Sequence, residues 1–270
     1  MVNSKTREDK TKNQELNRVV QSNPATRKAG RSKKILIIVP TYNEIENIEL
    51  IYQRIKKAVG NGGDILFIDD KSPDGTGKVA DRLAKSDKHI KVIHRAGKLG
   101  LGTAVLEGLH YALNHSYHLV ITLDADLSHD PANIPKMLEL MDRYDLVIGS
   151  RYVRDGGMVN WSIRRLLISL FANFVLKKIL GIKQMDCSGA FKCYTIELLR
   201  KIQVDRIISK GYVFYVEILY RAIRARARIQ EIPIIFVNRD KGKSKLGMNE
   251  VVGYAVNIFK LRFLTLIGKI

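Results

Sequence analysis

Residues 34–44 read KILIIVPTYNE, a short run rich in β-branched residues that passes through a proline into a polar, aromatic turn. A run of this length and composition predicts a buried strand over Lys34–Val39. The next stretch, Glu44–Ala58, carries apolar side chains at helical spacing, which predicts a helix with one buried face. The same order of strand, polar turn and helix then repeats along the chain.

This repeat predicts an α/β fold. Further strands are expected at four apolar runs, Asp64–Ile68, Lys91–His94, His118–Leu123 and Asp145–Gly149, with helices near residues 76–85, 103–114 and 131–142. Alternating strands and helices indicate a Rossmann-like, mostly parallel sheet flanked by helices. Ligands of such sheets bind beyond the carboxyl ends of the strands. The alternation stops after about residue 155, and one more strand is expected near Ile229–Val237.

The length of 270 residues fits one catalytic domain with appendages. We expect a flexible basic tail over residues 1–33, a catalytic domain over 34–247 and a C-terminal amphipathic helix over 248–270. A second apolar and basic helix is expected near 161–180. No window reaches the roughly 18 to 20 apolar residues that span a bilayer. These two helices are therefore expected to lie in a membrane interface, with ordinary core helices as the alternative.

The composition limits the classes of binding partner but does not identify one. The formal net charge of +19 favours an anionic partner, and nucleic acid, acidic lipid and nucleotide sugars all qualify. Cys187 and Cys193 form no CxxC pair and have no histidines at metal-ligand spacing, so neither a disulfide framework nor a zinc site is indicated. The charged first residues lack the apolar core of a secretory signal, so we expect the chain to start in the cytosol.

Asp124-Ala125-Asp126 follows the apolar strand directly and is the strongest chemical signal. Two carboxylates at i and i+2, at a strand end where the chain turns, can share one hard cation such as Mg²⁺ or Mn²⁺. The alternative is a loop with two solvated aspartates. A second acidic pair, Asp69-Asp70, ends another strand, and neighbouring carboxylates repel unless cations or hydrogen-bond donors lie among them.

Other residues at the strand ends allow more than one reading. Asp69 and Asp74 can serve chemistry or simply make turns and cap helices. Tyr42 and Glu44 could stack on and hydrogen-bond a nucleobase, while Asn43 could be a helix cap. The segment Gly100-Leu101-Gly102 lacks the third glycine of a dinucleotide fingerprint, so we expect no nicotinamide cofactor.

The segments VPTYNE, IDDKSPDGT, GLGTA, DADLSHDP and GSRY, in this order, resemble the inverting family 2 glycosyltransferases of the A-type fold. The later segments KGYVFYVEI and NRDKGKSKLG narrow the resemblance to dolichol-phosphate mannosyltransferases of the type without spanning helices. The match covers roughly Lys34–Gly247. It implies transfer of mannose from GDP-mannose to dolichyl phosphate, with inversion and with Mg²⁺ or Mn²⁺.

The same resemblance implies a setting. The product would be dolichyl β-D-mannosyl phosphate, used in glycosylation and in making glycosylphosphatidylinositol anchors. The enzyme would work at the cytosolic face of the endoplasmic reticulum membrane, bound to the membrane surface and to small membrane-anchoring partner subunits. No nucleic-acid partner is expected.

The resemblance also implies roles for single residues. The nucleoside pocket would be lined by Pro40, Tyr42, Glu44, Ile68 and Asp70. The metal would be held by Asp124 and Asp126, which together with Ala125 would contact the donor diphosphate. Ser128 is a further candidate metal ligand; many relatives carry glutamine there, and the shorter hydroxyl would reach a metal only through a water. Phosphates would be bound by Arg151, Arg239 and Lys245. Arg164 and Arg165 either hold the acceptor phosphate or are solvated.

We expect no dedicated general base, because a lipid phosphate is already anionic. Three rival functions remain at this stage. The first is the same chemistry with UDP-glucose, which the segment around residues 238–247 disfavours. The second is a nucleic-acid-binding module, although no interleaved aromatic and basic surface is evident. The third is a catalytically silent scaffold, which the intact acidic and basic residues argue against.

Overall fold

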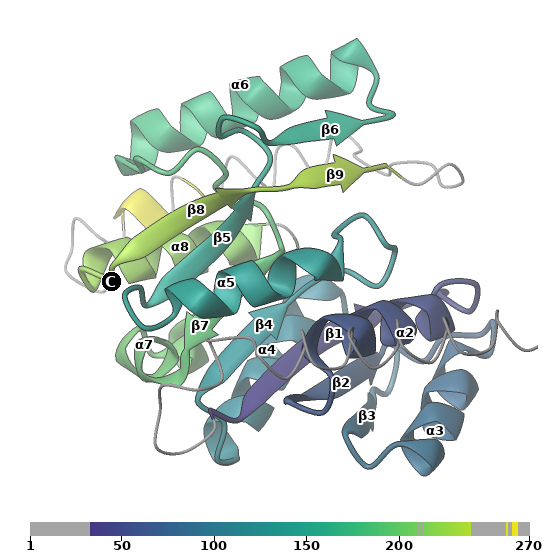
Figure 1. The fold of residues 1–270 in the computed structure, drawn as a ribbon. Coiled ribbons are helices and arrows are strands. Elements are labelled where there is room, and N and C mark those ends of the chain that lie inside the picture. Colours follow the sequence, from purple (N-terminus) through teal and green to yellow (C-terminus); the bar gives the residue numbers. More distant parts are fainter. Residues whose placement is uncertain (1–32, 210, 212, 239–257, 259–260, 264–270) are drawn as a thin grey trace, which may run out of the picture. The chain divides into compact units, whose positions relative to one another are not determined.

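A seven-stranded sheet forms the centre of the computed structural model, which describes residues 33–209, 211, 213–238, 258 and 261–263 (Figure 1). The strands run in the order β3-β2-β1-β4-β7-β5-β8. Their bounds are β1 Ile35–Thr41, β2 Gly63–Asp69, β3 Ile90–His94, β4 Leu119–Thr122, β5 Leu146–Ser150, β7 Lys192–Thr195 and β8 Ile229–Pro233. Within the described residues β7 is antiparallel to β4 and β5, and the other pairs are parallel.

Helices cover both faces of the sheet because successive strand residues point to opposite sides. On β1, Leu36 and Ile38 enter one core cluster while Ile37 and Val39 enter the other. The helices are α2 Ile48–Val59, α3 Thr76–Ser86, α4 Leu101–Asn114, α5 Ile134–Leu140, α6 Ile163–Leu180, α7 Ile196–Lys201 and α8 Val213–Arg224, with 3₁₀ turns at Pro131–Asn133 and Val204–Arg206. Residues of α2, α3 and α5 pack in one cluster, and residues of α4, α6, α7 and α8 in the other.

The expected α/β class and mostly parallel sheet are confirmed. The first helix starts at Ile48 instead of Glu44, because the Glu44 carbonyl accepts the amides of Asn47 and Ile48 and forms a turn first. The expected strand over 229–237 is two strands. Its first half, β8, pairs with β5, and its second half, β9 (Ile235–Val237), pairs with β6 (Gly157–Val159) in a separate small sheet. The sequence did not predict β7, α7 or α8.

Helix α6 confirms the helix expected near 161–180 but packs through few side chains. Asn173, Leu176 and Leu180 are its buried residues. Its exposed apolar side chains are Ile163, Leu167, Ile168, Leu170, Phe171 and Phe174. Among the described residues, no helix has both the length and the apolar character needed to cross a membrane.

Two expected segments lie mainly outside the described residues. They are the tail over residues 1–33 and the C-terminal helix over 248–270. In the second segment, the described residues Ile258 and Leu261 are helical and buried in the core cluster that contains α4.

Helix α4 approaches the sheet so closely at Gly108 that a Cβ there would lie 2.7 Å from Ile38 Cγ2 and 2.9 Å from Ile68 Cδ1. We therefore expect Gly108→Ala to destabilise the fold by about 1–3 kcal/mol, although alanine is the better helix former. Gly97→Ala is the matched control, since a Cβ there meets nothing within 4 Å. Urea unfolding of both variants tests this; equal midpoints would show that α4 can shift to admit the methyl group.

Candidate active site

The carboxyl ends of the parallel strands meet at one edge of the sheet. Tyr42 follows β1, Asp70 follows β2, Asp124 lies two residues beyond β4 and Arg151 follows β5. Strand β1 lies between β2 and β4, and Ile38 is level with Thr122. The residues expected at the strand ends are thus brought to the same edge, as the sequence predicts.

Asp70 is held by the loop that leads into α4. Its Oδ1 accepts Arg95 Nη1 at 2.6 Å, and its Oδ2 accepts the amides of Leu99 at 3.1 Å and Gly100 at 2.9 Å. The Asp70 and Arg95 side chains are 6% and 4% exposed. Buried carboxylates need such partners, so Asp70 fixes this loop, and its contact with a nucleoside stays a prediction. No sequence motif indicates a role for Arg95.

The Tyr42 ring lies next to this loop, and Lys98 Nζ is 4.2 Å from its centroid. This cation–π contact puts an ammonium group beside the ring expected to stack on a base. The side chain of Ile68 is fully buried and packs beneath Gly108, so it cannot line an open pocket; only its backbone could. Pro40 is partly buried, while Glu44 and Ala125 are 5% and 2% exposed.

Asp69 and Asp74 have the structural roles that the sequence allowed. Asp69 Oδ2 accepts the Ser72 amide at 3.0 Å, and its Oδ1 accepts the hydroxyls of Ser72 and Thr41. Asp74 accepts the Thr76 amide at 2.9 Å at the start of α3. Burial opposes ionisation of Asp74, but hydrogen bonds from Thr76 prevail and lower the pKa of its carboxyl group. Both aspartates shape the turn after β2.

The loop after β4 presents Asp124 and Asp126. Asp126 Oδ1 accepts the Ser128 amide at 3.0 Å and the Ser128 hydroxyl at 2.5 Å. The Ser128 hydroxyl therefore orients Asp126 directly, and at 1% exposure Ser128 has little access to a ligand of its own. Asp124 is part-exposed, with 24% of its side chain accessible. Two oxygen-donor side chains remain at the strand end, as the sequence predicts.

Three loops at this edge contain a non-glycine residue in the left-handed region. They are Asn43 (φ 58°) after β1, Lys71 (φ 55°) after β2 and Leu127 (φ 64°) after β4. Each such residue costs about 1–2 kcal/mol relative to ordinary helical backbone. Each of the three loops therefore includes a backbone conformation that non-glycine residues seldom adopt.

His129 supports the Asp124–Asp126 loop from below. Its Nδ1 accepts the Asp124 amide at 3.3 Å, and its ring packs against Phe191 and Phe236 at 5.5 and 5.3 Å between centroids. Burial lowers the pKa of the imidazole to about 4, although the charge of Asp126 opposes this shift. His129 is therefore a neutral support at pH 7. This histidine stands within the segment DADLSHDP, where no sequence pattern assigns it a role.

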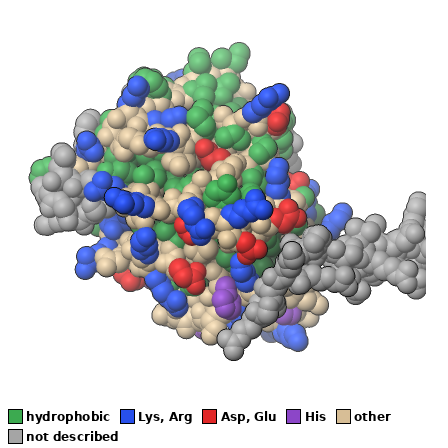
Figure 2. Space-filling view, turned by 60° about the vertical axis from the view of Figure 1, so that its left-hand side comes forward, with side chains coloured by type: hydrophobic (Ala, Val, Ile, Leu, Met, Phe, Trp, Pro, Cys, Tyr) green, Lys and Arg blue, Asp and Glu red, His purple; other side chains and the backbone are tan. Residues whose placement is uncertain are grey.

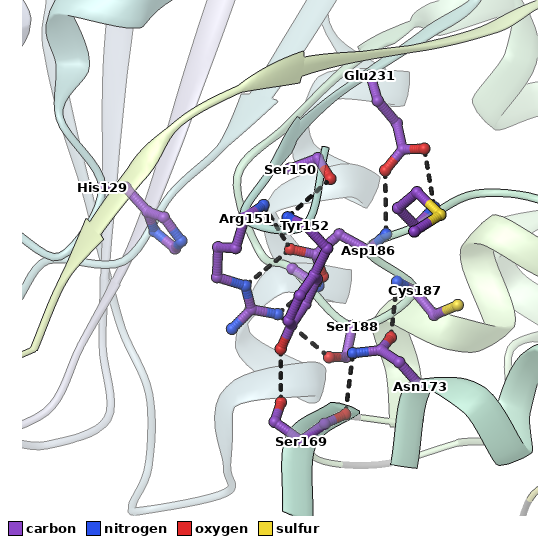
Figure 3. Close-up of polar contacts among 12 residues, drawn as sticks. His129, Ser150, Arg151, Tyr152, Ser169, Asn173, Asp186, Cys187, Ser188 and Glu231 are labelled. Carbon is purple, nitrogen blue, oxygen red and sulfur yellow. Dashed lines mark hydrogen bonds and ion pairs between the residues drawn. The ribbon is translucent and has the colours of Figure 1, made fainter. Parts of the chain in front are cut away.

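Arg151 forms a two-point ion pair with Asp186. Its Nε and Nη2 each lie 2.7 Å from a carboxylate oxygen of Asp186, whose side chain is 0% exposed. The rings of Tyr152, Trp161 and Phe236 surround the guanidinium at 5.2–5.8 Å. The expected arginine is thus at the site edge, but a carboxylate that the sequence analysis did not identify holds one side of it (Figure 3).

The other predicted basic residues differ in their placement. Arg165 stacks over Trp161 at 4.1 Å and donates Nη1 to Asn238 Oδ1 at 2.8 Å, which joins α6 to the end of β9. Arg164 is exposed on α6. Arg239 and Lys245 lie outside the described residues. The roles predicted for all four on phosphates remain predictions.

A family model described as "Glycosyl transferase family 2" matches residues 36–203. The chain belongs to glycosyl transferase family 2. This confirms the family expected from the motifs, and the matched span contains Asp124, Asp126 and Arg151.

Curated proteins of this family resemble the chain over most of its length. It is 43% identical over 223 residues to an undecaprenyl-phosphate mannosyltransferase of Micrococcus luteus, covering 83% of this chain and 91% of that protein. It is 40% identical over 222 residues to a polyprenol monophosphomannose synthase of Mycolicibacterium smegmatis, covering 82% and 83%.

Solved structures share the fold of this family 2 chain at lower identity. Glucosyl-3-phosphoglycerate synthase of Mycobacterium tuberculosis, solved with Mn²⁺, UDP-glucose and phosphoglyceric acid, matches with a TM-score of 0.61 and 18% identity over 86% of this chain and 79% of that chain. A mannosyltransferase of Pyrobaculum calidifontis, solved with GDP-mannose and Mn²⁺, matches with a TM-score of 0.54 and 17% identity over 86% and 64%.

The buried His129 predicts a pH dependence of stability. Between about pH 6.5 and 4 the unfolded chain binds a proton at this residue that the folded chain does not, so stability falls as the pH falls through this window. From pH 7 to 4.5 the expected loss from this group is about 2 kcal/mol. In His129→Asn, whose side-chain oxygen can accept the Asp124 amide, that part of the loss should vanish. Parallel slopes of unfolding free energy against pH for the two proteins would contradict this.

Proposed function

We propose that this family 2 glycosyltransferase transfers mannose from GDP-mannose to a polyprenyl phosphate, with inversion, to give a β-linked mannosyl phospholipid. The two curated relatives above support the sugar and the acceptor class, since both are named for mannosyl transfer to a polyprenol or its phosphate. Dolichyl phosphate is the acceptor implied by the sequence motifs, and undecaprenyl phosphate is the one in the first relative's name. Both belong in the test.

The observation that carries the proposal is the placement of Asp124, Asp126 and Arg151 at one edge of the sheet. Burial opposes the charge of Arg151, but Asp186 above all, and Asp124 to a lesser extent, raise the pKa of its guanidinium. Nucleoside diphosphates need cationic partners, and magnesium and manganese in such sites take one or two carboxylates together with substrate phosphates. No group of three His, Cys, Asp or Glu side chains in the described part of the chain forms a metal site, so the aspartate pair and the donor's phosphates would complete the set.

The residues present fit a divalent cation. Asp124 and Asp126 would hold it, with Asp126 oriented by Ser128. Such an ion offsets charge on the departing diphosphate. Arg151 supplies a second, fixed positive charge at the same edge, suited to phosphate oxygens by its planar donors. The Tyr42 ring, with Lys98 beside it, offers a stacking surface for the base.

No side chain is needed to deprotonate the acceptor, because its phosphate oxygen is already anionic. His129, the imidazole nearest the aspartate pair, suits this reading: it is 2% exposed and its Nδ1 accepts a backbone amide. Attack of the phosphate oxygen on the anomeric carbon breaks the bond to the diphosphate. An α-linked donor then gives a β-linked product.

A glucosyl transfer from UDP-glucose is the second candidate, because a solved structure of the same fold holds that donor. The names of the more similar relatives favour mannose. A nucleic-acid-binding module and a silent scaffold lose support because the chain belongs to an enzyme family and retains both aspartates.

The acceptor's lipid tail calls for a membrane surface, and α6 offers an apolar one. Ile163, Leu167, Phe171 and Phe174 are 57–77% exposed. Hydrophobic side chains gather at the upper end of the view in Figure 2, where α6 lies in Figure 1. We propose that this face rests in the membrane interface. The curated relatives come from bacteria, so an endoplasmic reticulum location and membrane-anchoring subunits stay predictions.

We expect the purified chain in detergent to transfer radiolabelled mannose from GDP-mannose to polyprenyl phosphate with Mn²⁺ or Mg²⁺, and to lose this activity in EDTA. Asp126→Ala should lower kcat by about 100-fold or more, since charge stabilisation at the diphosphate is lost. Asp130→Asn is the matched control in the same loop, where an exposed aspartate caps Pro131–Asn133. Dolichyl and undecaprenyl phosphates are compared, and UDP-glucose is run in parallel. A wild type inactive with every pair would refute the proposal.

Binding to vesicles tests the membrane face separately from catalysis. Phe171→Glu should weaken flotation with anionic vesicles by about tenfold or more, because it puts a negative charge in place of an exposed aromatic ring that would enter the membrane interface. Leu50→Glu on α2 is the control at another exposed apolar residue. Equal binding by both variants would show that α6 is not the membrane face.

A further inference from the structure

Asp186 is a fully buried carboxylate in the loop between α6 and β7, and no motif quoted above contains it. Its Oδ2 accepts the Arg151 backbone amide at 3.1 Å and Nε at 2.7 Å. Its Oδ1 accepts Arg151 Nη2 at 2.7 Å and the Gly189 amide at 2.9 Å. A buried carboxylate is costly unless it is paired in this way. Arg151 is therefore fixed at both its backbone and its side chain by one residue.

Glu231 on β8 holds Asp186 in turn. Its Oε1 accepts the Asp186 amide at 3.0 Å and its Oε2 accepts the Met185 amide at 2.8 Å (Figure 3). Strand β8 pairs with β5, which ends next to Arg151. Asp186 precedes β7, Glu231 lies on β8 and Arg151 follows β5, so the three side chains come from neighbouring strands of the sheet.

The direction of the guanidinium follows from this pairing. Because the Nε and Nη2 edge faces Asp186, the Nη1 group of the planar guanidinium lies on the side away from Asp186. In Figure 3 the Arg151 side chain is seen between Asp186 and His129, and the His129 Nδ1 accepts the backbone amide of Asp124. The side of Arg151 away from Asp186 is thus the side of His129, which holds the start of the aspartate loop.

Asp186 also offsets a second buried cation. Lys192 on β7 is 0% exposed, donates Nζ to the Gly189 carbonyl at 2.5 Å and lies 5.0 Å from the Tyr215 ring centroid. Burial lowers the pKa of Lys192 to about 8, and the charge of Asp186 opposes that shift. The charge of Asp186 therefore offsets two cations, Arg151 and Lys192, and its loss would remove this compensation from both.

We propose that Asp186 is a positioning residue for the transfer reaction, which holds Arg151 so that its outward donors meet the phosphate oxygens brought to the Asp124–Asp126 loop. This inference rests on the proposed function. Arg151 makes the contact with substrate; Asp186 acts through it. A bare structural ion pair is the alternative, in which Asp186 would contribute to stability and leave catalysis alone.

Kinetics of the full chain in detergent separate the two roles. Asp186→Asn keeps the size of the side chain but loses the charge and one acceptor, and we expect kcat to fall by about 100-fold with a donor KM within about threefold of wild type. In an Arg151→Ala background the same change should cost less than about threefold, because the two residues act as one unit. Independent, multiplying losses would overturn the proposal.

Rescue of transfer activity by free guanidinium distinguishes a positioning role of Asp186 from a purely stabilising one, because a loss of stability alone would not be rescued in this way. Millimolar guanidinium should raise the kcat of Arg151→Ala by at least about tenfold. The planar ion can still bind to Asp186 and to the aromatic rings that surround the Arg151 guanidinium in the wild type. The double variant Arg151→Ala, Asp186→Asn should show no rescue. Equal rescue in both would refute a positioning role for Asp186.

Two further variants guard against unfolding. Asp145→Asn is the matched control: Asp145 makes the same two-point pair with Arg228, at the other end of β5, and transfer should be unchanged. Glu231→Gln leaves Asp186 in place but weakens its support, and should lower kcat by a smaller factor, about tenfold. If Asp186→Asn fails to fold, an unchanged kcat in Glu231→Gln overturns the proposal. An inactive wild type would instead refute the proposed function.

Discussion

The structure depends on the compensation of negative charges that the sheet brings close together at one edge. Parallel strands deliver their carboxyl ends to one edge, so Asp70, Asp124 and Asp126 cannot be spread apart without breaking the fold. Each has a donor or a positive charge nearby: Asp70 has Arg95 and two backbone amides, Asp126 has the amide and hydroxyl of Ser128, and Asp124 has the charge of Arg151. The edge can therefore hold acidic side chains ready for a cationic ligand without losing the compact state.

The sequence predicts the parts of the molecule in which local pattern and tertiary role agree. Strands β1 to β5 and their helices follow from apolar runs at regular spacing, and the turn-making roles of Asp69 and Asp74 follow from the residue types beside them. Strand β7 escapes prediction because it is four residues long, starts with a buried lysine and follows a helix, so that no periodicity marks it. Arg95 and Asp186 escape because their partners lie 25 and 35 residues away in the chain.

The antiparallel strand β7 is the reason that Asp186 reaches the site. Its amino end lies at the same edge as the carboxyl ends of its parallel neighbours β4 and β5. The residues that precede it are consequently delivered to that edge, although most of the chain after residue 155 has no strand–helix alternation. One reversed strand therefore supplies a carboxylate that a purely parallel sheet would have placed at the opposite side.

Helix α6 is tied to the site by polar contacts: Tyr152 to Ser169 at 2.6 Å, Arg165 to Asn238, and Asn173 to Cys187 at 3.2 Å. Its outer face is apolar while its inner face packs through few side chains. Exposed apolar faces of this kind favour association with lipid, detergent or other protein surfaces. The colloidal behaviour of the protein thus depends on how well the outer face of α6 is covered, and particle size in light scattering measures that coverage.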